Sequence, residues 1–258
     1  MARLLLFWLC ATTAGAFPIE YFQLGLTVPG FLSHLLPGSG ADSHRAAAAA
    51  PTRSAEEETI GWFDPRPNGG RLLDYTTKKY GEPLNVIISG ASDPYILTDE
   101  GFHVYRNARS LGYSEECLGM HMGHLHDANL GDGNGRMTEL FLVRQYYFPV
   151  WGTCWESLAG GHHFRAWKQN GTLANSGAWF IGASKERDSS KNHVIAPDGY
   201  NIGRDWFVER AIEGKNWKGI WWKADLEWRE GLLLPGRKGV NHGIEQDGRV
   251  AVLTVKRL

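Results

Sequence analysis

Three side chains that could bind a ligand alternate along one predicted strand of this 258-residue chain. His163, Arg165 and Trp167 occupy every second position, so they share one face of the strand, and the apolar residues between them share the other. We expect the apolar face to pack on the core and the polar face to be accessible. A guanidinium offers a planar fork of donors, so this face would suit an anionic or polar ligand. Ordinary cross-strand pairing on a half-exposed sheet is the alternative explanation.

Three polar residues further along the chain could complete a pocket beside this face. Glu186 follows the next predicted strand, His193 lies in a polar loop, and Arg204 opens a predicted helix. If the loop folds back over the strands, these side chains would join His163 and Arg165 around a phosphate or carboxylate, with one histidine as acid or base. The sequence does not show that they meet, and charged residues at a helix start need no ligand to explain them.

A second group of histidines offers donors for a metal ion. His121, His124 and His126, followed by Asp127, are suitable ligands for zinc or copper. A strand would place His124 and His126 on one face, and a helix would place His121 and His124 on one face, so no regular element gathers all three. We therefore expect no metal site, and solvated loop histidines are the favoured interpretation. The three histidines stay the weaker alternative.

Composition excludes several classes of protein. The chain carries 27 Lys and Arg against 28 Asp and Glu, a net charge of -1, whereas a nucleic-acid-binding protein needs clustered positive charge. We find no glycine-rich dinucleotide fingerprint, P-loop, zincin helix or nucleophile elbow. No motif indicates a cofactor.

The first residues are typical of a secretory signal peptide. Arg3 precedes the apolar run Leu4–Cys10, and Ala14-Gly15-Ala16 fits the small-residue cleavage rule, so we predict a signal peptide over 1–16. The apolar run is about a dozen residues long, and roughly 20 are needed to span a bilayer. No later segment is apolar enough to span. We therefore expect a secreted, extracellular protein with no membrane span.

Secretion gives meaning to two further features. Cys10 would leave with the signal peptide, and Cys117 and Cys154 would then form a disulfide in an oxidising compartment, with two buried thiols as the alternative. Asn170-Gly171-Thr172 is an N-glycosylation sequon that coincides with a turn signal, which predicts a glycoprotein with Asn170 on a surface loop.

We divide the remaining chain into a low-complexity linker or pro-segment over 17–58 and one folded domain over 59–258. Strand-length apolar runs alternate with few helices, which predicts an α+β domain with a mixed or antiparallel sheet and two or three helices. The predicted elements are a strand at 84–89, a helix at 101–111 capped by Thr98, a strand or short helix at 139–147, a hairpin of 162–169 with 177–184, a helix at 204–213, and strands at 218–229 and 249–256.

Tryptophans gather late in the chain, at 217, 221, 222 and 228. Trp221 and Trp222 point to opposite faces of any strand, so one of them can be exposed and could stack on a sugar. Most of the others are expected to fill the core.

Part of the chain resembles the LssY-type C-terminal domain. The resemblance covers about 83–213 and lies in the segment His162 to Trp167, the segment Ala178 to Ser184, His193, and Arg204-Asp205. The resemblance implies a domain of poorly defined function in a membrane-lipid or envelope context, and it implies no catalytic activity. The positions that match the family's pattern are His163, Arg165, Trp167, His193 and Arg204. Glu186 stands where the family tends to have Asp, and Asn201 and Gly203 replace two acidic positions.

These observations predict a secreted binding module for an anionic or polar ligand, such as a lipid head group or a cell-surface glycan. The first alternative is a hydrolase of phosphoester-type bonds, with His163 and His193 as acid and base and Arg165 holding the anion. The second is a secreted, effector-like protein whose partner is another protein.

Overall fold

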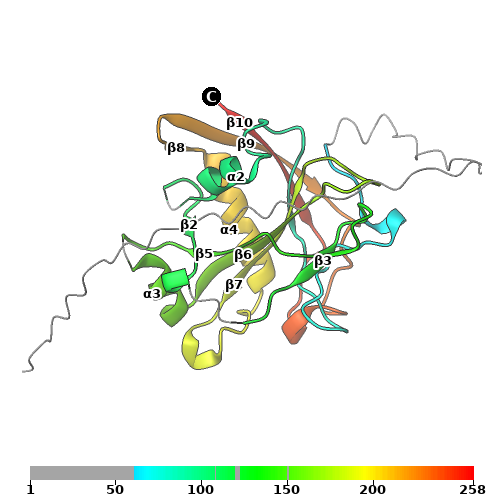
Figure 1. The fold of residues 1–258 in the computed structure, drawn as a ribbon. Helices are drawn as coiled ribbons and strands as arrows, with labels where there is room; N and C mark the ends of the chain where they lie inside the picture. The colour runs from blue at the N-terminus through cyan, green and yellow to red at the C-terminus, as the bar shows by residue number, and fades with distance from the viewer. Residues whose placement is uncertain (1–60, 108, 120–122, 150) are drawn as a thin grey trace, which may run out of the picture. The chain divides into compact units, whose positions relative to one another are not determined.

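The computed structural model describes residues 61–258 except 108, 120–122 and 150, and all of them belong to one compact unit. The predicted signal peptide (1–16) and linker (17–58) lie outside the described residues. The described part is an α+β domain with an eight-stranded mixed sheet, a two-stranded sheet and three α-helices, as the sequence predicts (Figure 1).

The large sheet has the order β2-β5-β6-β7-β1-β10-β9-β8. Strand β1 is parallel to β10, and the other neighbours are antiparallel. The strands are β1 (Val86–Ile88), β2 (Tyr113–Ser114), β3 (Asp127–Asn129), β4 (Arg136–Thr138), β5 (Phe141–Gln145), β6 (Gly161–Lys168), β7 (Trp179–Glu186), β8 (Lys215–Trp217), β9 (Ile220–Arg229) and β10 (Val250–Arg257), with β3 and β4 forming the small sheet.

The helices are α2 (Asp99–Arg106), α3 (Gly152–Ala159) and α4 (Gly199–Glu213), with 3-10 turns η1 (Arg66–Asn68), η2 (Cys117–Gly119), η3 (Ser189–Lys191) and η4 (Asn241–Gly243). Two of the three α-helices of the described residues were predicted from the sequence, and α3 was not. Thr98 caps α2, because its hydroxyl accepts the Gly101 N–H at 3.0 Å. Helix α2 stops at Arg106 rather than 111, since Asn107 is extended with ψ 156°. Helix α4 begins five residues before Arg204.

The predicted hairpin is confirmed and sets the register at the candidate site. Strands β6 and β7 pair antiparallel, with His163 opposite Ser184 and Arg165 opposite Gly182. The loop between them carries Asn170, which is exposed. Strand β5 lies on the other side of β6 and places Arg144 opposite His163.

Both faces of the sheet are covered. On one, the helix face, Phe164 and Trp179 pack against Phe102 of α2 and Phe207 of α4. On the other, the loop face, Trp167 lies in an apolar cluster with residues from the segments before β1 and after β9. The expectation of an accessible polar face on β6 is therefore wrong, since His163, Arg165 and Trp167 are 2%, 7% and 1% exposed.

The predicted disulfide joins Cys117 of η2 to Cys154 of α3, with an S–S distance of 2.08 Å. Of the two adjacent tryptophans on β9, Trp222 is buried and Trp221 is 52% exposed. Among the described residues, no helix combines the length and apolar character needed to cross a bilayer.

Candidate functional site

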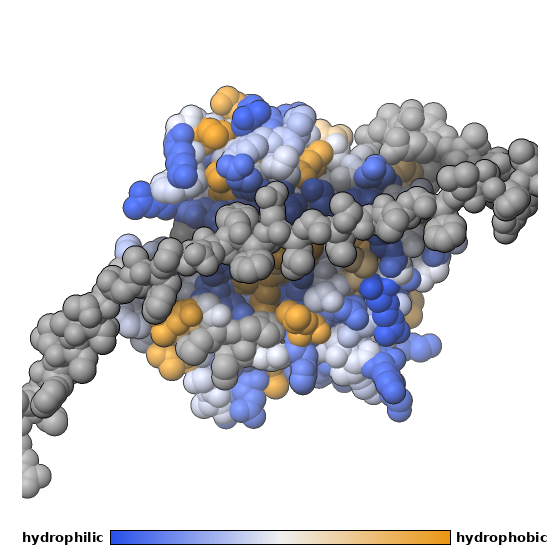
Figure 2. All heavy atoms as spheres, in the orientation of Figure 1, coloured by the Kyte–Doolittle hydropathy of each residue, from blue (hydrophilic) through white to orange (hydrophobic). Residues whose placement is uncertain are grey.

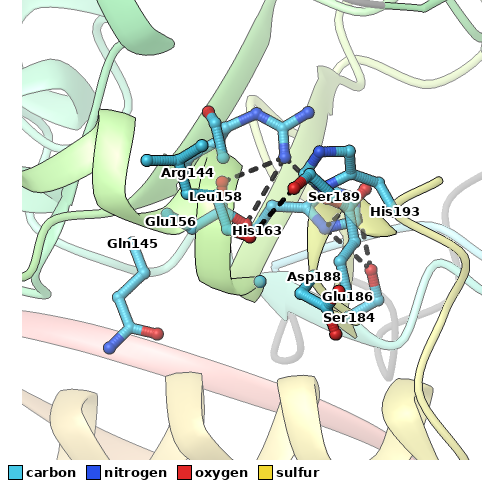
Figure 3. A network of polar contacts seen from close by, with 12 residues as sticks. Arg144, Gln145, Glu156, Leu158, His163, Ser184, Glu186, Asp188, Ser189 and His193 are labelled. Atoms are coloured by element: carbon cyan, nitrogen blue, oxygen red, sulfur yellow. Dashed lines mark hydrogen bonds and ion pairs between the residues drawn. The ribbon is translucent and has the colours of Figure 1, made fainter. Parts of the chain in front are cut away.

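A polar network occupies one end of the loop face. Arg144 on β5, His163 on β6 and Ser184 on β7 are cross-strand neighbours, so the sheet register places their side chains side by side. Glu186 lies two residues beyond Ser184 and points to the same face. Figure 3 shows these side chains converging, with dashed lines between them.

Arg144 lies at the centre of this network. Its Nη1 atom lies 2.6 Å from Glu186 Oε2 and 3.1 Å from Glu156 Oε2, and its Nε atom donates to Glu116 Oε1 at 3.2 Å. One buried guanidinium thus contacts three carboxylates. Charges that are paired and hydrogen-bonded in this way can remain buried without neutralisation.

Two carboxyl groups in the network have pKa values shifted in opposite directions. Burial raises the pKa of Glu156, on the inner side of α3, to about 7. Burial also acts on Glu186, but the neighbouring imidazoles and Arg144 outweigh it and hold its pKa far below the usual range. Such divergence is typical of acid–base pairs. However, Glu156 is 0% exposed, so a substrate cannot reach it without rearrangement.

Ser184, His163 and Glu186 contain the groups of a catalytic triad without its geometry. The Ser184 hydroxyl lies 3.2 Å from His163 Nδ1 and 3.3 Å from His163 Nε2, so it is in line with neither ring nitrogen, and Nδ1 lies 3.5 Å from Glu186 Oε1. A triad needs the hydroxyl and the carboxylate on opposite ring nitrogens. Ser184 is 1% exposed, and burial lowers the pKa of His163 to about 3. His163 is therefore a neutral, enclosed imidazole.

His193 forms the accessible edge of the network. Its Nδ1 atom lies 3.3 Å from Glu186 Oε2, and its side chain is 29% exposed. A side-chain hydrogen bond with Glu186 raises the pKa of His193, and partial burial opposes that shift. The turn η3 before His193 contacts α3, because Ser189 Oγ donates to the Leu158 carbonyl at 3.2 Å (Figure 3).

The network continues through Arg165 to a second buried group. Arg165 pairs with Glu139, whose other oxygen accepts the His126 backbone N–H at 2.6 Å. The His126 Nδ1 atom lies 2.7 Å from Asp74 Oδ2. Glu82 lies beside them, and burial and Asp74 raise its pKa to about 7. The side chains of Asp74, Glu82 and His126 come from loops that cover the sheet.

An exposed aromatic patch lies on the outer side of α3. It consists of Tyr147, Phe148, Trp151, Trp155 and Leu158, each more than 40% exposed. Phe148 and Trp155 are in ring contact, with centroids 6.3 Å apart. Figure 2 shows hydrophobic residues at the lower left of the molecule, in the region of α3. Exposed apolar clusters of this kind are typical of binding surfaces.

The structure brings together part of the predicted site. His163, Glu186 and His193 meet as proposed, with Arg165 linked to them along β6. Trp167 instead lies in the apolar cluster of the loop face. The remaining candidates are dispersed.

Arg204 belongs to a different set of contacts. It pairs with Asp205 and Asp247 and lies 5.0 Å above the ring of Trp228.

Of the three histidines weighed as a metal site, His126 is buried beside Asp74, His124 is exposed, and His121 lies outside the described residues.

Sequence reasoning missed Asp74, Glu82, Glu139, Arg144 and Glu156. Arg144 carried a usable signal, since a lone charge in the apolar run of β5 indicates a buried ion pair. Asp74 and Glu82 lie in loops with no periodicity, so their approach to His126 had no local signal.

The arrangement favours neutral or cationic ligands over anions. The guanidinium groups of Arg144 and Arg165 already face carboxylates, and the carboxylates outnumber these arginines. An added anion would displace one of those pairs.

Comparisons with protein-family models, with curated proteins and with solved structures gave no match, and the resemblance to the LssY-type domain stays a prediction.

Proposed function

We propose that this chain is an exported protein that binds a neutral glycan on the aromatic patch and at the His193 edge of the polar network. The observation that carries the proposal is the composition of α3. Its outer side exposes Trp155 and Leu158, and its inner side supplies Glu156 to the network. One helix thus connects an exposed aromatic surface to a set of polar acceptors.

The chemistry of a sugar suits both parts. An indole presents a flat apolar surface on which the C–H face of a sugar ring can stack, and Trp151 and Trp155 are 58% and 48% exposed. Carboxylate oxygens accept hydrogen bonds from sugar hydroxyl groups, and an imidazole can accept them or donate them. His193 and the outer edge of Glu186 are the groups nearest solvent in the network.

A phosphate-bearing lipid head group is less well supported, because the buried arginines are engaged by carboxylates. Hydrolysis is also less well supported, since the serine hydroxyl and the carboxyl group of raised pKa are enclosed. Retention by anionic vesicles in the binding experiment would reveal the first of these alternatives.

The binding test compares matched tryptophan variants. The purified chain is incubated with insoluble cellulose, chitin and β-glucan, and with vesicles containing anionic lipid. We expect one polysaccharide to retain the protein, and Trp151→Ala with Trp155→Ala to weaken binding about tenfold or more. Trp221→Ala is the control, because Trp221 is equally exposed but lies on β9. Retention by the vesicles alone, or equal loss in the control, contradicts the proposal.

Export is supported by the apolar N-terminal run, the Cys117–Cys154 disulfide and the exposed position of Asn170. Expressed with its own N-terminus in a eukaryotic secretory host, the chain should appear in the medium beginning at Phe17. Endoglycosidase treatment should lower its apparent mass, and Asn170→Gln should abolish that change. Retention inside the cell with residues 1–16 attached contradicts export.

A further inference from the structure

Three polar side chains on the loop face converge without forming part of the glycan surface. Asp74, Glu82 and His126 are 1%, 6% and 6% exposed. Each offers a ligand atom, and the three atoms lie within 4.8 Å of one another. They come from separate segments, so the fold and not a local motif brings them together.

Asp74 is held in place by hydrogen bonds to one of its two oxygens. Its Oδ1 atom accepts the backbone N–H groups of Thr76 and Glu82 at 2.9 and 2.8 Å, and the Thr76 hydroxyl at 2.7 Å. These donors orient the carboxylate and leave Oδ2 facing His126. Donors of this kind are the outer contacts that fix metal ligands in proteins.

Among the described residues, no arginine or lysine forms an ion pair with either carboxylate of the cluster, and Arg71 donates to the main-chain carbonyl of Asp74. The Glu82 carboxylate accepts a bond from Asn241 at 3.4 Å, and no other hydrogen bond from the described residues reaches it. The nearby guanidinium of Arg165 is paired with Glu139. Two adjacent buried carboxylates with one imidazole are costly unless a proton or a cation accompanies them.

We propose that Asp74, Glu82 and His126 bind one divalent transition-metal ion. One nitrogen and two carboxylate donors suit Zn²⁺ or Mn²⁺ better than Ca²⁺, which prefers an all-oxygen shell. In a tetrahedral shell with bonds of about 2.1 Å, neighbouring ligand atoms are about 3.4 Å apart, so atoms up to 4.8 Å apart must approach by about 1.4 Å when the ion binds. The ion would replace the proton between His126 and Asp74.

This site is independent of the glycan surface, and metal binding can be measured without any glycan. The full chain is purified without a histidine tag, stripped with a chelator, and titrated with Zn²⁺ or Mn²⁺ alone. We expect one equivalent per chain by elemental analysis, and a higher melting temperature when the metal is present.

The variants separate this site from adventitious binding. Glu82→Gln keeps the shape of the side chain and should weaken metal binding 100-fold or more, and His126→Gln should do the same. His124→Gln is the matched control, because His124 is exposed and two residues away, and it should bind as the native chain does. Circular dichroism of each metal-free variant shows whether it is folded.

Two results would overturn the proposal. The first is a native chain that binds less than a tenth of an equivalent of either metal and melts unchanged, with Glu82→Gln melting higher, which would show that Glu82 holds a proton. The second is stoichiometric binding that survives in folded Glu82→Gln or His126→Gln, or that disappears in His124→Gln. If a variant fails to fold, the native stoichiometry and the His124→Gln control still decide the matter.

Discussion

The two faces of β6 are both buried, and they are stabilised in different ways. Phe164 contacts Phe102 and Phe207 on the helix face, where ring packing and the removal of apolar area from water stabilise the fold. On the loop face, His163 and Arg165 are enclosed among charged side chains. Alternation along β6 therefore places Phe164 in one interior, and His163 and Arg165 in another that they share with Trp167.

This difference bears on function. A buried ion pair often stabilises a fold no better than apolar side chains of the same volume. Stability alone does not account for the ionisable groups gathered on the loop face, and clusters of shifted pKa values are typical of functional sites. The contacts of Phe164 on the helix face, by contrast, are explained by packing.

The largest expected effect comes from removing the central cation of the loop face. Arg144→Met leaves the carboxylates of Glu116, Glu156 and Glu186 buried without it, which should lower the free energy of unfolding by about 3–5 kcal/mol. Urea denaturation measures the change. On the helix face, Phe164→Ala should cost about 3–5 kcal/mol through a cavity.

Rescue distinguishes the two losses. Adding Glu156→Gln and Glu186→Gln to Arg144→Met should restore at least half of the lost stability, because the uncompensated charges are removed. The same two changes should not restore Phe164→Ala. A triple variant no more stable than Arg144→Met would show that the loop face depends on packing as the helix face does.

A smaller effect should appear on acidification. His163 has a pKa of about 3 in the fold and near 6.5 when unfolded, so between these pH values the unfolded state binds the extra proton, and this residue's contribution to stability falls as pH falls. Relative to the native chain, His163→Asn should therefore gain about 1.4 kcal/mol for each pH unit below 6.5.

The measurement is denaturant unfolding of both proteins at pH 7.0, 6.0 and 5.0. The comparison cancels the other titrating groups, provided that those facing His163 keep their own behaviour. These groups are Glu186, Arg144, Arg165 and His126. A stability difference that is constant with pH would mean that His163 is charged in the fold.

The smallest expected effect is at Ser184. Ser184→Ala removes a hydroxyl that contacts the His163 ring, so the free energy of unfolding should fall by about 1 kcal/mol. Thermal melts measure the loss. If glycan binding by the folded variant stays within twofold of native, Ser184 has no role in binding, whereas a larger loss would give it one.

Much of the fold could be predicted from the sequence, because the signals were local. Thr98 is a typical helix N-cap and indicates the start of α2. The turn signal at Asn170-Gly171 indicates that the apolar segments on either side pair as β6 and β7. The end of α2 was placed too late, since the apolar residues after Arg106 belong to the core without being helical. Exposure of the polar face could not be predicted, because the segments that cover it lie far away in sequence.

The candidate site was only partly predictable for the same reason. His163 and Glu186 are placed by strand register, which the hairpin signal supplies. The position of His193 near Glu186 could be expected because only six residues separate them in the chain. The meeting of Asp74 with His126 depends on contacts between loops 52 positions apart, for which a single sequence has no pattern.

The close approach of α4 to β7 links the two faces mechanically. A Cβ atom at Gly203 would lie 2.3 Å from the main chain of Ser184, so no larger residue fits there without moving the strand or the helix. Ser184 and Glu186 take their positions from that strand. The position of the polar side chains on β7 therefore restricts residue 203 of α4 to glycine. A protein designer who transferred the network to another scaffold would also have to transfer this contact between α4 and β7.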